Sequence, residues 1–188
     1  MLIALNKPYG VLSQFTPEAP GQRTLAEFGL PPKVYPVGRL DRDSEGLLLL
    51  TDDNRLKARL LDPRSGTAKV YWAQVEGEPS AQAIAQLSAG VDIRIKKRSH
   101  RTAPASVSEL PDPGLPRRDP PVRFRKTVPT AWLELAITEG KNRQVRRMCA
   151  AVGLPVLRLY RASVGPYSIA GLAPGSWRAI SGERPPSA

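Results

Sequence analysis

The sequence predicts an α+β fold with a mixed, mostly antiparallel central sheet flanked by helices and loops. Candidate strands and candidate helices are mixed along the chain without the strict alternation of α/β proteins. The chain has 188 residues, of which 41% are hydrophobic. This length and composition are sufficient for one domain, or a closely packed pair of subdomains, with a substantial core.

The N-terminal part predicts two strands separated by a loop. The apolar run "LIAL" (2–5) is a short strand that a proline and a glycine stop. Residues 16–38 contain five prolines and three glycines, so we expect mostly loop with a short helix at 24–28. The continuous apolar run "GLLLLT" (46–51), bounded by turn residues, is typical of a strand buried on both faces.

Two helices and one strand are predicted next. Asp52 or Asp53 is a suitable N-cap for a helix whose inner face carries Leu56, Leu60 and Leu61. The segment "AKVYWAQVEG" (68–77) is rich in β-branched and aromatic residues, which favours a strand. Ser80 then caps a second helix, with Ile84 and Leu87 facing inward and Gly90 at its end.

The C-terminal part combines an irregular segment with further regular elements. Seven prolines fall between 104 and 129, so residues 99–130 are predicted as an ordered or semi-ordered loop or binding arm rather than a second domain. Alternating apolar positions predict a strand at 131–138, and the spacing of Val145, Met148, Cys149 and Val152 predicts an amphipathic helix. That helix spans 142–153, further strands are expected at 155–162 and 176–180, and the tail 184–188 is expected to be frayed.

Charge is the strongest global signal. The 28 Lys and Arg against 17 Asp and Glu give a net charge of +11, with a pI near 10.3. This balance favours a polyanionic partner, nucleic acid first, although a basic surface kept for solubility is the alternative. The charge is clustered, because residues 94–126 hold ten basic and three acidic residues, with Phe124 and several prolines between them. We therefore place RNA recognition in this segment, with a solvated loop as the alternative.

Other classes are disfavoured by what the sequence lacks. Its apolar runs are too short to cross a membrane, and its first residues do not form a signal peptide, so we expect a cytoplasmic protein. One cysteine and one histidine argue against a disulfide framework and a zinc site. No phosphate-binding loop or dinucleotide-binding glycine motif is present.

The segment "GRLDRDSEGLLLLTDD" (38–53) carries acidic residues at alternate positions, and three interpretations compete. The spacing of Asp41, Asp43, Glu45 and the following residues matches an EF-hand loop, but the preceding prolines exclude an entering helix and two arginines flank the acidic residues. For Asp43 and Glu45 we favour structural pairing with nearby arginines or loop amides. The third possibility is a nucleophile or base at the mouth of a buried strand, and spacing alone does not choose Asp41 over Asp43.

Four motifs, in order along the chain, resemble those of pseudouridine synthases. "GRLDRDSEGLLLLT" is similar to the motif around the catalytic aspartate of that superfamily, with Ser44 where threonine is usual. "LNKPYGVL" (5–12) resembles the N-terminal motif, and "KVYWAQVEG" (69–77) carries the Lys-x-Tyr strand. "EGKNRQVRRM" (139–148) resembles the helix signature of the family. The retained hydroxyl of Ser44 leads us to expect little effect from that departure.

The resemblance is strongest to the E type of large-subunit rRNA pseudouridine synthases, within the small- and large-subunit rRNA branch. It implies the pseudouridine synthase fold, with two abutting subdomains forming one catalytic domain over residues 1–183. No N-terminal S4-type RNA-binding domain is expected. The implied reaction converts uridine to pseudouridine in 23S rRNA near the peptidyl-transferase centre, by way of a flipped-out base. It implies no cofactor and no metal, and we expect a monomer.

The same resemblance assigns roles to individual residues. It implies that Asp41 is the nucleophile, that Arg146 pairs with it, and that Tyr71 stacks on the target base. Spacing alone favours a solvated helix face for Arg146 and a core position for Tyr71. The resemblance implies further contacts to substrate or RNA. Arg39 is expected to fill the gap left by the base, and the expected phosphate contacts are Lys141, Arg143 and Arg147. Lys7 and Lys69 are expected to be active-site neighbours or simple backbone contacts.

A second function remains open at this point. The same fold can serve as a non-catalytic rRNA-binding or ribosome-assembly factor. The presence of Asp41, Tyr71 and Arg146 together favours the enzyme. A uracil-nucleoside enzyme is disfavoured, because a net charge of +11 has no use on a small neutral substrate.

Overall fold

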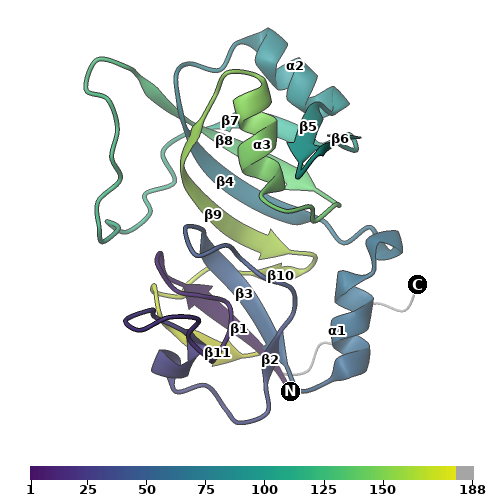
Figure 1. The fold of residues 1–188 in the computed structure, drawn as a ribbon, viewed down its shortest axis with the longest axis vertical. Helices are drawn as coiled ribbons and strands as arrows, with labels where there is room; N and C mark the ends of the chain where they lie inside the picture. The colour runs from purple at the N-terminus through teal and green to yellow at the C-terminus, as the bar shows by residue number, and fades with distance from the viewer. Residues whose placement is uncertain (181–188) are drawn as a thin grey trace.

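A computed structural model describes residues 1–180, and it confirms the α+β class (Figure 1). One sheet runs through the molecule in the strand order β11-β1-β3-β9-β4-β8-β7, with β2 beside β3 and β10 beside β9. Its strands are β1 (Leu2–Lys7), β2 (Tyr35–Pro36), β3 (Glu45–Thr51), β4 (Lys69–Glu76), β7 (Ser106–Leu110), β8 (Thr130–Ile137), β9 (Val156–Val164), β10 (Tyr167–Ser168) and β11 (Trp177–Ala179). Among these strands only the β3–β9 pair is parallel, so the sheet is mixed and mostly antiparallel, as predicted.

Helices and one hairpin complete the described part of the chain. The helices are α1 (Asn54–Leu61), α2 (Ala81–Ala89) and α3 (Gln144–Ala151), with short 3-10 turns η1 (Leu25–Phe28) and η2 (Pro63–Ser65). The strands β5 (Asp92–Ile95) and β6 (Arg98–Arg101) form a separate two-stranded sheet. No described helix is long and apolar enough to span a membrane. The expected domain boundary at 183 and the frayed tail 184–188 lie outside the described residues.

The helix caps agree with the predictions from the sequence, but one residue expected on the inner face of a helix does not lie there. Asp53, rather than Asp52, caps α1 by accepting hydrogen bonds from two amides of its first turn. Ser80 caps α2, and Gly90 follows its last residue with a positive φ of 87°. The prediction that Leu61 faces the core was wrong, because it is 44% exposed. It directly follows the buried Leu60, and one residue turns a helix by about 100°, which moves Leu61 off the core face.

The segment 99–130 is more regular than predicted. The expectation of a continuous loop was wrong, because it contains β6 and β7, and the adjoining β5 was not predicted either. Ser106–Leu110 forms the edge of the sheet and pairs with β8 through backbone hydrogen bonds, to which its polar composition gives no clue. Residues 111–129 do lack regular secondary structure, as expected.

The sheet divides into two halves that meet at β3 and β9. The parallel contact consists of two residue pairs, Glu45 with Tyr160 and Gly46 with Arg161. In one half, β3 is buried on both faces, with Leu47 and Leu49 in one core cluster and Leu48 and Leu50 in another, which confirms the prediction for this strand. In the other half, β4 and β8 pack with α2 and α3 around a third cluster. These halves correspond to the two abutting subdomains.

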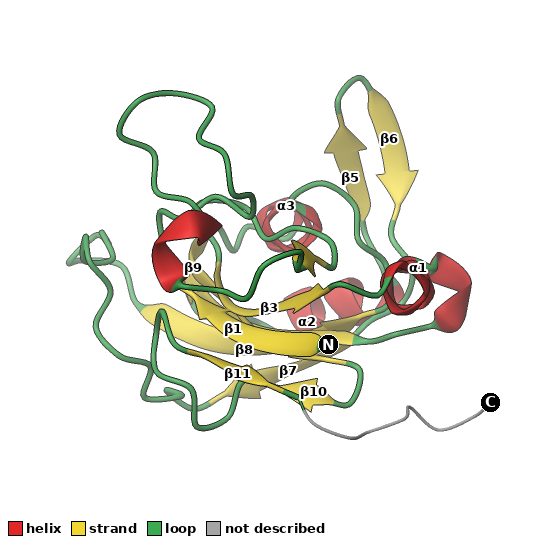
Figure 2. Cartoon of the chain, turned by 90° about the horizontal axis from the view of Figure 1, so that it is seen from below, coloured by secondary structure: helices red, strands yellow, loops and turns green. Residues whose placement is uncertain are grey.

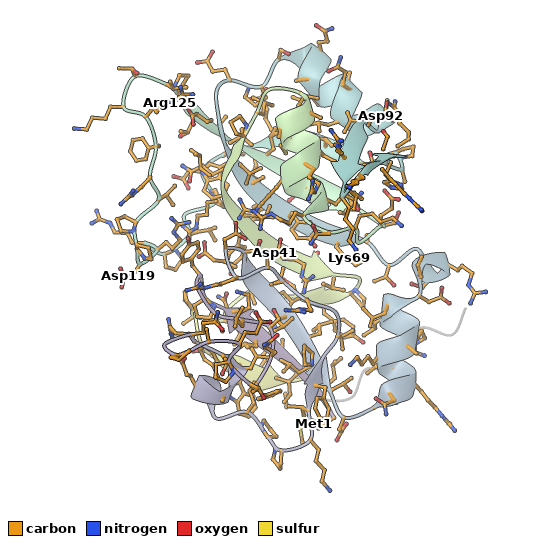
Figure 3. All side chains as sticks on the ribbon, viewed as in Figure 1. Met1, Asp41, Lys69, Asp92, Asp119 and Arg125 are labelled. Atoms are coloured by element: carbon orange, nitrogen blue, oxygen red, sulfur yellow. The ribbon has the colours of Figure 1, made fainter. Side chains whose placement is uncertain are left out.

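Gly46 makes the close approach of the two halves possible. A Cβ atom at this position would lie 2.4 Å from the carbonyl oxygen of Arg161 and 2.7 Å from its nitrogen. The φ of Gly46 is also +98°, a conformation that other residues rarely adopt. The loop that precedes Gly46 is thereby held against β9, and Figure 3 shows Asp41 and Lys69 at this junction.

Candidate active site

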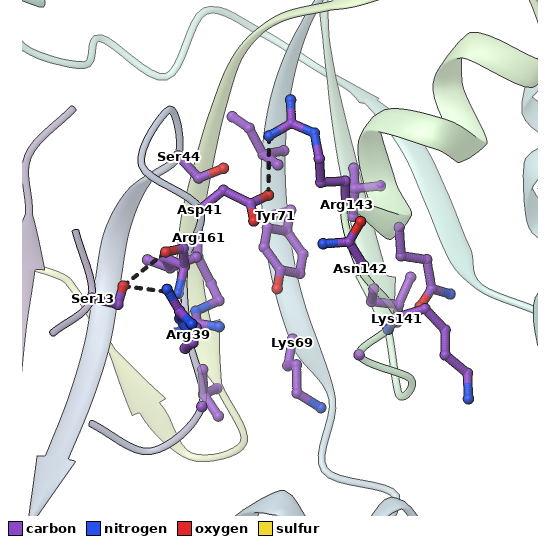
Figure 4. Close-up of a pocket in the computed structure, with 18 of the residues that line it drawn as sticks. Ser13, Arg39, Asp41, Ser44, Lys69, Tyr71, Lys141, Asn142, Arg143 and Arg161 are labelled. Carbon is purple, nitrogen blue, oxygen red and sulfur yellow. Dashed lines mark hydrogen bonds and ion pairs between the residues drawn. The ribbon is translucent and has the colours of Figure 1, made fainter. Parts of the chain in front are cut away.

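A cavity of about 480 Å³ lies at the junction of the two halves. The loop before β3 contributes Asp41, β4 contributes Tyr71, the segment before α3 contributes Arg143, and β9 contributes Arg161. Figure 4 shows these side chains around the cavity. Residues far apart in the sequence therefore meet at one site because β9 is inserted between β3 and β4.

The loop that carries Asp41 is anchored to the N-terminal segment. The Ser13 hydroxyl donates a hydrogen bond to the Leu40 carbonyl at 2.8 Å. The Leu40 amide donates in turn to Ser13 Oγ at 3.1 Å. The Gly10 amide donates to the carbonyl of Arg42 at 2.8 Å. With both neighbours fixed, the Asp41 carboxylate is 34% exposed and borders a second opening of about 470 Å³ lined partly by Tyr9.

The guanidinium that contacts Asp41 belongs to Arg143, which corrects the pairing expected for Arg146. Arg143 Nη1 lies 3.4 Å from Asp41 Oδ2. Both terminal nitrogens of Arg143 also donate to the Asp43 carboxylate, each at 2.8 Å. One arginine thus bridges the two aspartates, which fixes their relative orientation.

The backbone explains why Arg143 takes this place. It directly precedes α3 with φ 52° and ψ 35°, a left-handed conformation, and its side chain makes no capping hydrogen bond to the helix. Arg146 lies one turn later and is bound beneath the loop. It donates to the Asp43 carbonyl at 2.7 Å and to the Val156 carbonyl at 3.2 Å. Arg146 therefore ties the loop to the start of β9.

Charge and burial act together on these groups. Burial alone would raise the pKa of Asp43, but the hydrogen bond from Arg143 and the charges of Arg146 and Arg143 outweigh it and lower that pKa. Burial lowers the pKa of Arg146, against the attraction of Asp43. The loop is therefore held by an ionised Asp43 between two arginines.

Tyr71 and Arg161 face each other across β4 and β9. They are opposite residues in the register, directly after an irregularity between Val70 and Tyr71. Such bulges re-aim side chains, and paired residues lie on the same face of a sheet. Arg161 is 5% exposed, its Nε donates to the Leu47 carbonyl at 2.8 Å, and it lines the cavity with Tyr71. Sequence reasoning did not single out Arg161, although an arginine in a strand of mostly apolar residues was the available signal.

Lys7 is buried, which corrects its expected contact with RNA. Its side chain has no exposed surface, and its Nζ donates to the carbonyls of Pro8 and Val11, each at 2.9 Å. Burial lowers its pKa to about 7, although the nearby carboxylates of Glu45, Asp43 and Asp41 favour its charged form. The alternative interpretation, a lysine bound to the backbone, describes this position.

The other expected contacts lie around the rim. Lys69, Lys141 and the exposed Arg39 line the cavity, with Lys69 Nζ bonded to the carbonyls of Thr67 and Thr138. Burial lowers the pKa of Lys69, and the charge of Arg161 lowers it further. Arg147 does not line the cavity, because its guanidinium is bound to the Asn142 and Arg94 carbonyls.

The remaining acidic residue of the cluster has a structural role, as predicted for Asp43 and Glu45. Glu45 accepts two hydrogen bonds from Arg158, at 2.8 and 2.9 Å, and both side chains are at most 8% exposed. This ion pair spans the junction of β3 and β9. Within residues 1–180, no group of three or more His, Cys, Asp or Glu side chains is arranged to hold a metal ion.

The comparisons with known proteins agree with this geometry. Residues 1–151 match the family model described as RNA pseudouridylate synthase. A ribosomal large subunit pseudouridine synthase E from Xanthomonas campestris is 60% identical over 95% of this chain and 94% of its own length. A protein of the same name from Vibrio vulnificus is 49% identical over 96% of the chain and 75% of its own length.

A solved structure extends the agreement to the fold. The crystal structure of a pseudouridylate synthase superposes with a TM-score of 0.78 at 28% identity, covering 96% of this chain and 70% of the other. The match spans both halves of the sheet, and the four sequence motifs surround the cavity between them. The chain therefore belongs to the RNA pseudouridylate synthase family.

Proposed function

We propose that this protein isomerises a specific uridine of large-subunit rRNA to pseudouridine, with Asp41 as the nucleophile. The observation that carries the proposal is the position of the Asp41 carboxylate, which opens onto a cavity shared with Tyr71 and Arg161. The Xanthomonas and Vibrio relatives are named as large-subunit enzymes, which supports that choice of substrate. A uridine near the peptidyl-transferase centre stays our prediction.

The reaction needs no change in oxidation state. The bond between N1 of uracil and C1′ of ribose breaks, the base turns, and a bond forms between C5 and C1′. C5 loses its proton and N1 gains one, so atoms and electrons balance. A carboxylate that reacts directly with the nucleotide must be ionised and correctly oriented. The contact of Arg143 with the Asp41 carboxylate provides this orientation.

The other residues suit an extruded base. The half-buried ring of Tyr71 offers a face on which uracil can stack. Arg161 supplies a buried positive charge on the same face of the sheet. The exposed Arg39 is placed to fill the gap in the RNA, and Lys141 to meet a phosphate. We further propose that the protein acts as a monomer in the cytoplasm, without a cofactor.

The test is tritium release from rRNA labelled at uridine C5. Wild-type protein should release tritium from large-subunit rRNA, supplied naked or in ribosomal particles. Asp41→Asn should release none while binding the RNA, because the amide keeps the shape and loses the nucleophile. Asp52→Asn changes an exposed carboxylate that pairs with the N-terminal amine and does not line the cavity, so it is the matched control and should behave as wild type.

The alternative function makes the opposite prediction. A non-catalytic rRNA-binding factor would bind the RNA without tritium release, and Asp41→Asn would change nothing. Absence of release from every form of the rRNA would therefore reject the proposed reaction and leave the cluster around Asp41 as a structural feature.

A further inference from the structure

The β5–β6 hairpin is a cationic projection that stands apart from the main sheet. Figure 2 shows it extending on the same side of that sheet as α3. Its residues 92–101 carry five basic side chains and one acidic side chain, all exposed. The basic ones are Arg94, Lys96, Lys97, Arg98 and Arg101. Only Arg101 among these five forms an ion pair within residues 1–180, with Asp92 at 3.3 Å.

At the tip of the hairpin, a charged residue adopts an unfavourable backbone conformation. Lys96 has a φ of 55°, in the left-handed region where glycine or asparagine is favoured. Within residues 1–180, the other non-glycine residues with positive φ are Lys33 and Arg143, so all three are cations. Residues that keep a strained conformation often have a functional reason, and a lysine at the tip supplies charge that asparagine does not.

The base of the hairpin is firmly attached to the body. Ile93 is 3% exposed and belongs to the core cluster under α2 and α3. The Val91 amide donates to Thr102 Oγ1 at 2.9 Å, and the Thr102 amide donates to the Val91 carbonyl at 3.0 Å. Since an isolated two-stranded hairpin is only marginally stable, these contacts are what hold the charged tip in place.

Glu139 connects this hairpin to the segment that carries Arg143. One carboxylate oxygen lies 3.0 Å from His100 Nε2 on β6. The other accepts the amide of Ala103 at 2.9 Å and the side-chain amide of Gln144 at 2.8 Å. Burial would raise the pKa of Glu139, but these hydrogen bonds outweigh it and lower the pKa.

Gln144 completes the connection at the start of α3. Its side-chain oxygen accepts the amide of Lys141 at 3.0 Å, and the residue is buried. Arg143 makes no capping hydrogen bond to the helix, so the contacts of Glu139 and Gln144 support the segment 139–143 together with the bonds of Arg143 to the two aspartates. The position of Arg143 beside Asp41 therefore depends on a carboxylate that also holds the base of the hairpin.

We propose that the β5–β6 hairpin binds the phosphate backbone of the RNA away from the target uridine. Glu139 is then a positioning residue that fixes the hairpin and Arg143 relative to each other. The inference rests on the proposed function for the identity of the RNA. It adds a second contact region outside the cavity. It also gives a carboxylate so close to a polyanion-binding surface a structural reason, since three groups hydrogen-bond to it.

The first test removes charge from the tip without weakening the hairpin. In the double variant Lys96→Asn with Arg98→Thr, asparagine suits the left-handed position and threonine suits a strand. The melting temperature should be unchanged or higher. Affinity for transcribed large-subunit rRNA should fall, and the slope of log K against log salt should shrink by about 1.4–1.8, the value for two lost phosphate contacts.

A matched control separates the hairpin from net charge. Arg55→Gln with Arg59→Gln removes two exposed charges from α1 and should leave the salt slope unchanged. An equal loss in this control, or wild-type affinity in the tip variant, would overturn the assignment of the hairpin as a contact region.

The second test addresses the connection. Glu139→Gln keeps the shape but offers one acceptor oxygen for three donors. Because small displacements of an active-site group can cost up to about 100-fold in rate, kcat should fall about 10- to 100-fold with little change in KM. Glu109→Gln, at an exposed residue of β7 that does not line the cavity, is the matched control and should behave as wild type. Wild-type kcat in Glu139→Gln, or a loss confined to KM, would overturn the connection.

Two readouts do not require activity. Hydrogen exchange of the amides in 139–144 should be faster in Glu139→Gln than in wild type, and RNA affinity of the tip variant is measured by equilibrium binding. If wild-type protein releases no tritium, the proposed function fails, whereas these two measurements still decide the present inference. Unchanged exchange together with unchanged affinity would reject it.

Discussion

At the scale of single residues, Arg143 is the group on which the geometry of the site depends most directly. It bridges Asp41 and Asp43, and the bridge uses both ends of a planar guanidinium. A lysine has a single ammonium group and does not reproduce paired, parallel hydrogen bonds. The left-handed backbone at this position aims the side chain away from α3 and toward the two aspartates.

Arg143→Lys should therefore reduce kcat by about 10- to 100-fold, because Asp41 loses its orientation while the charge is kept. KM for the RNA should change less than kcat. Single-turnover tritium release with wild-type protein and the variant measures the effect. Arg147→Lys is the control, since that guanidinium is bound to carbonyl groups away from the cavity. Wild-type rates in Arg143→Lys, with a severe loss in Arg146→Lys, would return the pairing role to Arg146.

At the scale of elements, the start of β3 decides whether the two halves meet. Gly46 lies against the backbone of Arg161, at a distance that leaves no space for a side chain. The strand itself is buried on both faces, so it has no freedom to move away from β9 without disturbing two core clusters. The loop with Asp41 leads directly into this strand. A disturbance at Gly46 is therefore transmitted to Asp41, the proposed nucleophile.

Gly46→Ala should lower the free energy of unfolding by about 2–4 kcal/mol, from a strained φ and overpacking against Arg161. It should also lower kcat, because Asp41 shifts relative to Tyr71. Urea unfolding and tritium release measure the two effects. Gly66→Ala separates them, since Gly66 also has a positive φ but open space around it, and should cost only the backbone strain. Equal costs at the two positions would show that the close approach is unimportant.

The elements also show what the sequence can and cannot reveal. The strand at 46–51 and the helix caps at Asp53 and Ser80 are local features, so apolar runs and capping residues predict them. The polar strand β7 is stabilised by its pairing with β8, which is separated from it along the chain and invisible to local pattern. For the same reason the parallel contact of β3 with β9 was not predicted.

The site shows the same division between local and distant information. The resemblance of four motifs identified Asp41 and Tyr71 as cavity residues, and the structure brings both to one cavity. Choosing between Arg143 and Arg146 required the left-handed backbone before α3, which no helical periodicity indicates. Arg161 required the register of β4 with β9. Lys7 was placed among RNA contacts because its motif gives no sign of its complete burial.

At the scale of the whole molecule, Lys7 links the stability of the fold to pH. Its folded pKa is lowered from 10.5 to about 7 by burial. Between these values the unfolded chain holds a proton on Lys7 that the folded protein releases. The free energy of unfolding therefore rises with pH in this window, by up to about 1.4 kcal/mol per pH unit. Below the folded pKa, Lys7 is charged in both the folded and the unfolded state. The burial of that charge then lowers the free energy of unfolding by an amount that does not change with pH.

Lys7→Met should remove this dependence. Relative to wild type, the variant should be least stable at high pH, because wild type then carries a neutral amine that still bonds to the Pro8 and Val11 carbonyls. The difference should narrow as the pH falls from about 9.5 to about 6. Urea unfolding at both pH values measures it, and Lys69, present in both proteins, does not contribute to the difference. A stability difference independent of pH would contradict the lowered pKa.

The order of the strands also determines when the cavity can form during translation. β3 and β4 follow one another in sequence, yet in the finished sheet β9 lies between them. A ribosome that has made Asp41 and Tyr71 must still add the chain as far as β9 (Val156–Val164) before the two residues can share a cavity. A nascent chain that already contains Asp41 and Tyr71 but still lacks β9 therefore has no such cavity. The cavity can therefore form only after the ribosome has synthesised β9, and not when its first residues appear.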